Sequence, residues 1–368
     1  MAAASKARYE AFLVNNVSTI ATLESSLRSI TWFLPGRFKD AELASEALTT
    51  SLNVMSMYHD TLLERVVKAN PSYRPLIPTS LHTRFTKAWV DKDSLYKWAA
   101  RVLEIIRFTE LVVEMALRRK VSEKIKWRSI ILLEVIKASL RLILLKLTNR
   151  PLVSPPLPER DFDPTTLPSL SNATSPTLAP SSPSHSRPTT PDHLRNNLIP
   201  MEIHPHPLLT SSQSDVSAED FLLPKALTTS AVKPSLSLIR PLSASRDWIA
   251  EVIYVLRPLV YASLIVVDRK AHERTNKPLI VVLLMEFISR NLRRAPPASA
   301  TLERAEYARR DKDMLWYLLR GSIWDSYTRP KIESFVARTA HMPLIGLFGA
   351  LAKDWMPLID DYYYYTAP

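Results

Sequence analysis

The 368-residue chain contains no cysteine. This absence excludes disulfide bonds, thiol catalysis, and zinc or iron–sulfur sites that use cysteine ligands. The first ten residues, MAAASKARYE, also lack the apolar run of a secretory signal peptide, and the chain closes on YTAP rather than on an SKL-type organelle address. We therefore expect a protein of a reducing compartment that is neither secreted nor sorted by that C-terminal address.

Glycine is nearly as scarce, with four residues: Gly36, Gly321, Gly346 and Gly349. Their spacing cannot form a dinucleotide-binding fingerprint, a phosphate-binding loop or the nucleophile elbow of a hydrolase. A sheet-rich fold with many tight turns would also need more glycine. The sequence therefore predicts an all-α fold.

The charge balance is strongly basic, with a net charge of +12 and a pI of about 9.7. Both nucleic acid and anionic lipid are acidic partners that would suit such a chain. No RNA-binding signature, zinc-ligand spacing or basic recognition helix is found, so we expect no nucleic-acid partner. Of the two acidic partners, we therefore expect anionic lipid headgroups.

Residues 118–147 combine the densest positive charge with a long apolar run. Their basic residues are Arg118, Arg119, Lys120, Lys124, Lys126 and Arg128. Twelve Ile, Leu and Val residues follow within residues 129–147 and favour insertion into a bilayer by roughly 4–7 kcal/mol. Glu134, Lys137 and Arg141 interrupt that run and oppose insertion by roughly 8–10 kcal/mol, so the segment should not span alone.

Three arrangements remain open for this segment: it lies in a membrane interface, it sits in a bundle that pairs its charges, or it is a core helix of a soluble domain. We predict that the six bases form a membrane-targeting element.

The N-terminal half, residues 1–150, shows helical periodicity in three stretches. Apolar residues recur every three or four positions in residues 7–34 and again in residues 43–66, which predicts a helical hairpin. A third helix is expected at residues 94–120. Two interpretations of its charges remain open. Glu110 and Glu114 of this helix either pair with Lys137 and Arg141 of the next helix or form a solvated face. In the first case a charged seam, made of these four residues and Glu134, is hidden between the helices.

Residues 151–241 hold 17 of the 29 prolines and many Ser and Thr residues. Such a segment buries too little apolar surface to offset its chain entropy, so a disordered linker is expected. It divides the chain into an N-terminal helical half (1–150) and a C-terminal helical half (242–368).

The C-terminal half begins with the better candidate for a membrane span, residues 248–267. Its eleven Ile, Leu and Val residues contribute roughly −3 to −7 kcal/mol against roughly +3 kcal/mol for one central arginine. A shorter apolar run covers residues 278–288, and further helices are expected at 314–327 and 331–339. The tail, Tyr362 to Tyr365, either lies at a membrane interface or packs into a groove.

Five blocks outside the linker stand in a definite order: NVSTIATLESSLRSITWFLPGRFKDAELASEAL, IKASLRLILL, IAEVIYVLRPLVY, RRDKDMLWYLLRGSIWDSY and LAKDWMPLIDDYYYY. In this order they resemble the peroxin-16 family, which are peroxisome biogenesis factors of the peroxisomal membrane. The positions that carry the likeness are Glu24, Arg28, Gly36, Arg37, Phe38, Ser45, Glu46, Asn53, Arg257 and Pro258.

The resemblance implies a membrane protein that is not an enzyme, has no cofactor and recruits peroxin-3. It also implies that the protein helps other peroxisomal membrane proteins insert, that peroxin-19 is its targeting receptor, and that the route can pass through the endoplasmic reticulum. A helical lipid-binding or lipid-transfer protein at an organelle membrane is the alternative.

The histidine pairs do not favour an enzyme. His272-Glu273 does not extend to a metalloprotease motif, because Asn276 stands where the second histidine belongs. His59 falls beside an apolar stripe and is expected to be a core histidine.

Overall fold

The computed structural model describes residues 8–9, 12–13, 16–31, 41–69, 80–160, 234–270, 276–297, 299–339 and 342–364. Within these ranges the regular structure is helical and there is no strand, so the all-α prediction is confirmed. Three of the resemblance positions, Gly36, Arg37 and Phe38, and most of the expected linker, residues 161–233, lie outside the described residues.

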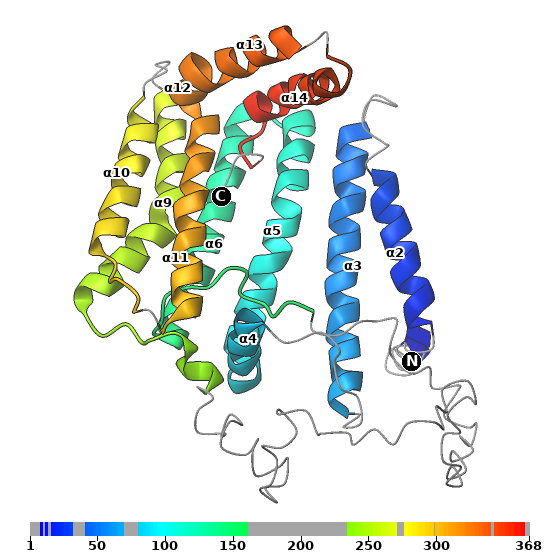
Figure 1. Ribbon diagram of the computed structural model, residues 1–368, viewed down its shortest axis with the longest axis vertical. Coiled ribbons are helices and arrows are strands. Elements are labelled where there is room, and N and C mark those ends of the chain that lie inside the picture. Colours follow the sequence, from blue (N-terminus) through cyan, green and yellow to red (C-terminus); the bar gives the residue numbers. More distant parts are fainter. Residues whose placement is uncertain are drawn as a thin grey trace, which may run out of the picture. The chain divides into compact units, whose positions relative to one another are not determined.

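The elements follow the chain in a simple order (Figure 1). They are α2 (Val17–Thr31), α3 (Ala41–Ala69), α4 (Leu81–Lys92), α5 (Ser94–Lys120), α6 (Glu123–Thr148), the 3₁₀ turn η4 (Ser235–Leu238), α9 (Ser245–Lys270), α10 (Lys277–Leu292), α11 (Thr301–Asp313), the 3₁₀ helix η5 (Met314–Leu319), α12 (Gly321–Ile323), the π-helical η6 (Trp324–Thr328), α13 (Arg329–Thr339) and α14 (Pro343–Asp361).

Local chemistry explains several of these boundaries. The Ser80 hydroxyl accepts the Thr83 amide at the start of α4, and the Asp93 carboxylate accepts the Leu95 amide at the start of α5. Asn149, in the left-handed conformation with a φ of 50°, ends α6. The starts of α4 and α5 and the end of α6 are therefore fixed by residues that favour a helix end.

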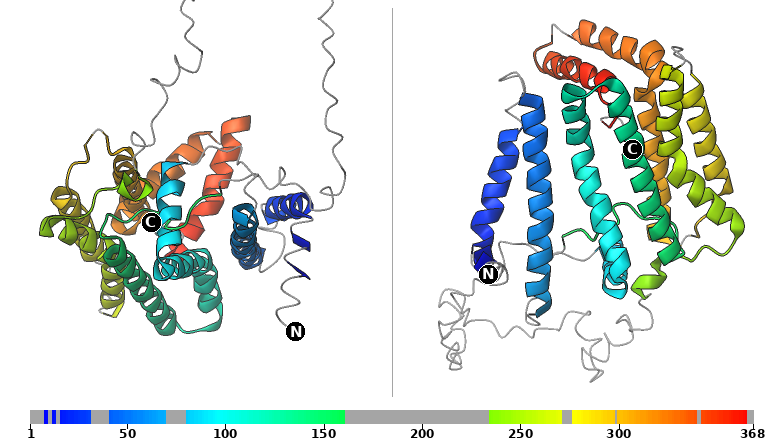
Figure 2. Two further views of the ribbon diagram at one scale, coloured as in Figure 1. Left: turned by 90° about the horizontal axis from the view of Figure 1, so that it is seen from below. Right: turned by 180° about the vertical axis from the view of Figure 1, so that it is seen from behind.

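The long helices pack side by side. Helix α9 contacts α10 and α6, α6 contacts α5, α5 contacts α3, and α3 contacts α2. The view from behind shows the same order, with α13 and α14 lying across one end of the long helices (Figure 2). The bundle therefore contains helices from both sides of the expected linker.

A shared core joins those two sides. Phe85, Trp89 and Leu144 are buried in one cluster with Ile239 and Leu302. The core cluster therefore makes residues before and after the linker parts of the same packed unit.

The edges of the expected linker belong to this core, contrary to the sequence prediction. Val153 and Ile239 are buried, and the Leu242 amide donates to the Asn149 carbonyl at 2.7 Å. Proline restricts the backbone but does not prevent neighbouring apolar side chains from packing. The proline-rich composition therefore predicts a linker that is too long at both ends.

Cleavage of the linker should leave the two halves associated, because their helices share the core cluster and the α6–α9 contact. A protease site inserted at Ser182 allows the cut, and co-purification of the fragments in detergent is the measurement. Fragments that separate would show that the halves are independent domains.

The helix expected at residues 314–327 is interrupted. The 3₁₀ helix η5 ends at Leu319, Arg320 has an extended backbone, and Gly321, the first residue of α12, has a φ of 52°. Glycine adopts this positive φ at little cost, so the break between η5 and α12 falls at a residue that tolerates it. Helix α14 continues through Pro357 and ends at Asp361.

Candidate functional site

The six predicted targeting bases lie where α5 ends and α6 begins. Arg118, Arg119 and Lys120 occupy the last turn of α5, where positive charge is favourable beside the unpaired carbonyls of the helix end. Val121 and Ser122 make the turn, and α6 starts at Glu123. We call this region the basic junction.

The structure divides the six predicted targeting bases into two groups. Five are exposed: Arg118, Arg119, Lys120, Lys124 and Arg128. Arg118 pairs with Asp361 at 2.7 Å, so we call the other four the four exposed bases, and Lys126 is buried. Lys126 is therefore not placed to meet headgroups, which corrects its expected role.

Glu114 lies at the centre of the junction and binds the C-terminal end of the described chain. Its two carboxylate oxygens accept the backbone amides of Tyr363 and Tyr364 at 2.8 and 2.9 Å. Lys126 Nζ lies 3.6 Å from the same carboxylate. Burial raises the pKa of Glu114, while the two amides and Lys126 act in the opposite direction.

The rest of the predicted seam is organised by Lys137. Its ammonium group bridges Glu110 at 2.7 Å and Glu134 at 3.0 Å. Burial raises the pKa of Glu110, and Lys137 opposes that shift. Glu114 pairs with Lys126 rather than with Arg141, because Lys126 lies in the first turn of α6, beside the end of α5.

The tyrosine tail packs into a groove between α6 and α9. Tyr363 stacks on Tyr261 with ring centroids 6.0 Å apart and meets Trp127 edge-on, also at 6.0 Å. Tyr364 is buried in the same apolar cluster as Ile130. For these two residues the groove alternative is the one that occurs, whereas Tyr365 lies outside the described residues.

The N-terminal resemblance positions hold α2 against α3. The Glu24 carboxylate lies 2.6 Å from the ring of buried His59, and Arg28 donates to Asn53 at 3.1 Å. Further along, the Ser45 hydroxyl donates to the Thr31 carbonyl at 2.8 Å. Glu46 is half-buried, and desolvation raises its pKa. These positions therefore have a structural role in the helical hairpin, and His59 is a paired core histidine.

A second buried charge network joins α9, α10 and α11. Arg257 pairs with Glu286, and Arg310 donates to both carboxylate oxygens of Glu251 at 2.8 and 3.1 Å. Pro258 follows Arg257 inside α9. Sequence reasoning missed Arg310, Glu286 and this role of Glu251, although a charge in an otherwise apolar helix signals the need for a partner.

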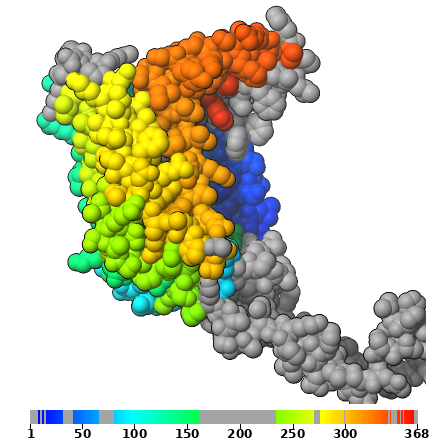
Figure 3. Space-filling view, turned by 60° about the vertical axis from the view of Figure 1, so that its left-hand side comes forward, coloured from blue at the N-terminus to red at the C-terminus, as the bar shows by residue number. Residues whose placement is uncertain are grey.

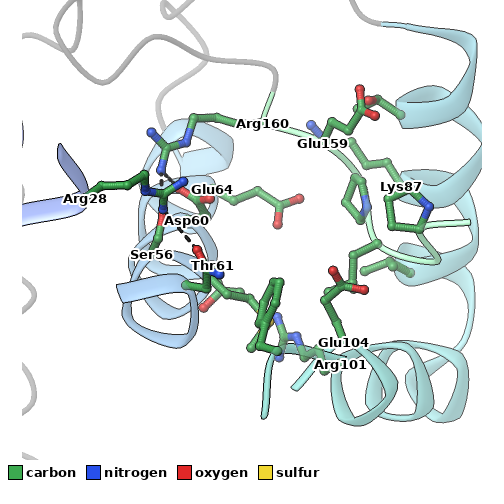
Figure 4. A pocket seen from close by; sticks show the side chains of 18 residues that line it. Arg28, Ser56, Asp60, Thr61, Glu64, Lys87, Arg101, Glu104, Glu159 and Arg160 are labelled. Carbon is green, nitrogen blue, oxygen red and sulfur yellow. Dashed lines mark hydrogen bonds and ion pairs between the residues drawn. The ribbon is translucent and has the colours of Figure 1, made fainter. Parts of the chain in front are cut away.

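A pocket of about 280 Å³ lies among α2, α3, α4 and α5 (Figure 4). Arg160 enters it and contacts Asp60, and it also donates to Ser56 at 3.3 Å. Its wall carries both acids and bases, among them Glu64, Lys87, Arg101 and Glu104. Within the described part of the chain, no group of His, Asp or Glu could hold a metal ion.

A larger pocket of about 900 Å³ opens beside the basic junction. Glu114, Lys126 and Trp127 line one side of it, and Tyr362 and Tyr363 of the tail line another. The wall carries both signs of charge as well as apolar groups.

The outer sides of α6, α9 and α10 carry an exposed apolar surface, and Figure 3 looks onto the part formed by α9 and α10. The exposed side chains include Leu132, Val135, Ile143, Val267, Ile280, Leu284 and Phe287. Ile280 is 61% and Leu284 58% exposed, which is unusual for residues of a helix that also packs in a bundle. We call this surface the apolar flank.

One helix in the described ranges, Ser245–Arg269, is long and apolar enough to cross a bilayer. A helix at the centre of a helical bundle has the same length and composition, and this one packs on α6 and α10. Among the described helices none covers the apolar flank, and exposed apolar surfaces of this kind mark membrane or protein interaction sites.

Comparison with known proteins agrees with these features. A family described as "Peroxisomal membrane protein (Pex16)" matches residues 7–361. The "Peroxisomal membrane protein PEX16" of Schizosaccharomyces pombe is 22% identical over 354 residues, which are 91% of this chain and 90% of the relative. The "Peroxisome biogenesis protein 16" of Arabidopsis thaliana is 24% identical over 360 residues, 92% of this chain and 93% of the relative.

No solved structure matches the chain significantly. The match to the family covers nearly the whole sequence and places the protein at the peroxisomal membrane, in peroxisome biogenesis rather than in catalysis. The chain belongs to the Pex16 family of peroxisomal membrane proteins.

Proposed function

We propose that the protein is a membrane-bound docking factor that recruits peroxin-3 and helps other peroxisomal membrane proteins insert. The observation that supports membrane binding is the apolar flank. Of its helices, α6 begins at the basic junction and α9 ends there. The partner peroxin-3, the receptor peroxin-19 and a route through the endoplasmic reticulum are what family membership implies.

The apolar flank suits the acyl region of a bilayer. Its residues on α10, such as Ile280, Leu284 and Phe287, recur at spacings of three and four and therefore share one side of the helix. Covering such side chains with lipid stabilises the bound state by about 25 cal/mol for each Å² of apolar surface removed from water.

The basic junction suits the headgroup region at the end of the same helices. Helix α6 starts there, α9 ends there, and Arg269 of α9 lies 3.3 Å from Glu123 of α6. Each Lys or Arg near an anionic surface contributes about 1 kcal/mol, so the four exposed bases contribute about 4 kcal/mol together. Apolar contact and charge attraction thus act on the same membrane.

Replacing Arg119, Lys120, Lys124 and Arg128 by Gln should leave the protein folded but make it cytosolic or spread it to other membranes. Gln keeps helix propensity while removing charge. Circular dichroism reports the fold, and localisation in cells that lack the native protein is the measurement. Arg118 and Lys126 stay unchanged, because their side chains are paired within the fold.

The matched control replaces four exposed bases remote from the junction, Lys92, Lys146, Arg246 and Arg304, by Gln. It has the same net charge and should still reach peroxisomes. If the junction variant also reaches them and restores their formation, the basic junction has a structural role only. Loss of peroxin-3 from peroxisomes in the junction variant, but not in the control, would support the recruitment step.

The alternative function, lipid binding or transfer, needs a cavity for acyl chains. The pocket of about 900 Å³ is lined by charged groups that include Glu114, Lys126 and Asp268, which does not suit an acyl chain. Purified protein that carries lipid in stoichiometric amounts and moves it between vesicles would favour the alternative.

A further inference from the structure

The last described residues cover part of the basic junction. Helix α14 ends at Asp361, and Asp361 pairs with Arg118 at 2.7 Å. The Arg118 guanidinium also lies 5.1 Å from the centre of the Tyr362 ring. Tyr363 and Tyr364 then bind Glu114 through their amides. We call residues 361–364 the strap.

The strap changes the charge that the junction presents. Asp361 neutralises Arg118, which is 39% exposed and otherwise continues the row formed by Arg119 and Lys120. The adjacent acid, Asp360, does not face this row, because it accepts the Trp324 indole proton at 2.7 Å and Arg329 at 3.1 Å. The effect of the strap on the basic surface therefore depends on one carboxylate.

The strap's tyrosines are packed against the bundle, with Tyr362 and Tyr364 buried, whereas the Asp361–Arg118 ion pair is exposed to solvent. One carboxylate, Glu114, holds two backbone amides, and one half-exposed ion pair holds the helix end. The large pocket runs along Tyr362 and Tyr363, so water already reaches this side of the strap. An anionic surface that attracts Arg118 would compete directly with Asp361 for it.

We propose that Asp361 of the strap masks the basic junction, and that an anionic phospholipid surface displaces the Asp361 carboxylate from Arg118 when it binds. This inference rests on the proposed membrane role of the junction and adds its regulation. The Asp361–Arg118 ion pair lowers the affinity of the free protein for anionic lipid, and its opening adds Arg118 to the four exposed bases.

The substitution Asp361→Asn tests the mask. It should tighten binding to vesicles of phosphatidylcholine with anionic phosphatidylserine roughly fivefold, the equivalent of about 1 kcal/mol for one more base at the surface. Co-sedimentation with vesicles measures the affinity, and vesicles of phosphatidylcholine alone should show no change. Asp360→Asn is the matched control, because it changes the net charge equally while Arg329 keeps Glu333 at 3.0 Å.

The variant Arg118→Gln should erase the gain, so that the double variant with Asp361→Asn binds like Arg118→Gln alone. Equal binding by the Asp361→Asn and Asp360→Asn variants would overturn the mask. If the four-base junction variant binds anionic vesicles as tightly as the native protein, the proposed membrane role of the junction fails instead.

Discussion

Replacing Arg310 by Met will lower the free energy of unfolding by about 3–5 kcal/mol, because it leaves a buried carboxylate without its partner. Arg310 is 1% exposed, and its guanidinium contacts Glu251 twice and Glu306 at 3.2 Å. It also donates to the Leu152 carbonyl at 2.6 Å. The loss therefore disconnects α11 from α9 and from the segment that enters the linker.

Arg309→Met is the matched control, since Arg309 is the neighbouring residue of the same helix and is half-exposed. Its ion pairs with Glu306 and Asp313 reach solvent, where such pairs contribute about 1 kcal/mol or less. Unfolding of both variants in one detergent by urea gives the two free energies. The double variant of Arg310→Met with Glu251→Leu should cost less than the sum of the single changes. Equal costs for Arg309 and Arg310 would refute the role of the buried network.

This network shows which part of the fold the sequence can indicate. Glu251 and Arg257 interrupt an apolar run. In the sequence alone, this interruption indicates a cost of membrane insertion but no partner for either charge. Arg257 pairs with Glu286 of α10, 29 residues later in the chain, and Glu251 pairs with Arg310 of α11, 59 residues later. Helix α11 itself was not predicted, because it buries Glu303, Glu306 and Arg310 and so has a weak apolar stripe.

The charged seam illustrates the limit on pairing. Spacings of three and four correctly place Glu110 and Glu114 on one side of α5 and Lys137 on a facing side of α6. They do not fix how far α6 is shifted along α5, and that shift gives Lys126 to Glu114. The binding of Tyr363 and Tyr364 by the same carboxylate was also beyond local patterns, because 249 and 250 residues separate them from it.

The resemblance positions form a family pattern that by itself implies no mechanism. In the structure, several of them join helices. Arg28 and Asn53 are 25 residues apart and meet because α2 and α3 form a hairpin. Arg257 is buried against Glu286 of α10. A pattern of this kind reports contacts between helices rather than chemistry, which is consistent with a protein that is not an enzyme.

Replacing Glu114 by Ala will also destabilise the protein by about 3–5 kcal/mol, because it leaves a buried lysine unpaired and two amides of the strap without an acceptor. The Glu114 side chain is fully buried, and that of Lys126 is 8% exposed. Glu114→Ala and Lys126→Ala remove the two sides of one interaction. The double variant should therefore cost clearly less than the sum of the single variants. Urea unfolding in one detergent gives all three free energies.

Two controls make this cycle specific. Lys124→Ala removes an exposed base two residues earlier in α6 and should change the free energy of unfolding by about 0.5 kcal/mol or less. Arg141→Ala combined with Glu114→Ala should be additive, because Lys126 rather than Arg141 pairs with this carboxylate. Coupling of Glu114 to Arg141 and additivity with Lys126 would reverse the assignment and restore the pairing expected from residue spacing. Coupling to Lys126 alone would establish that the end of α5, the start of α6 and the strap are stabilised as one unit.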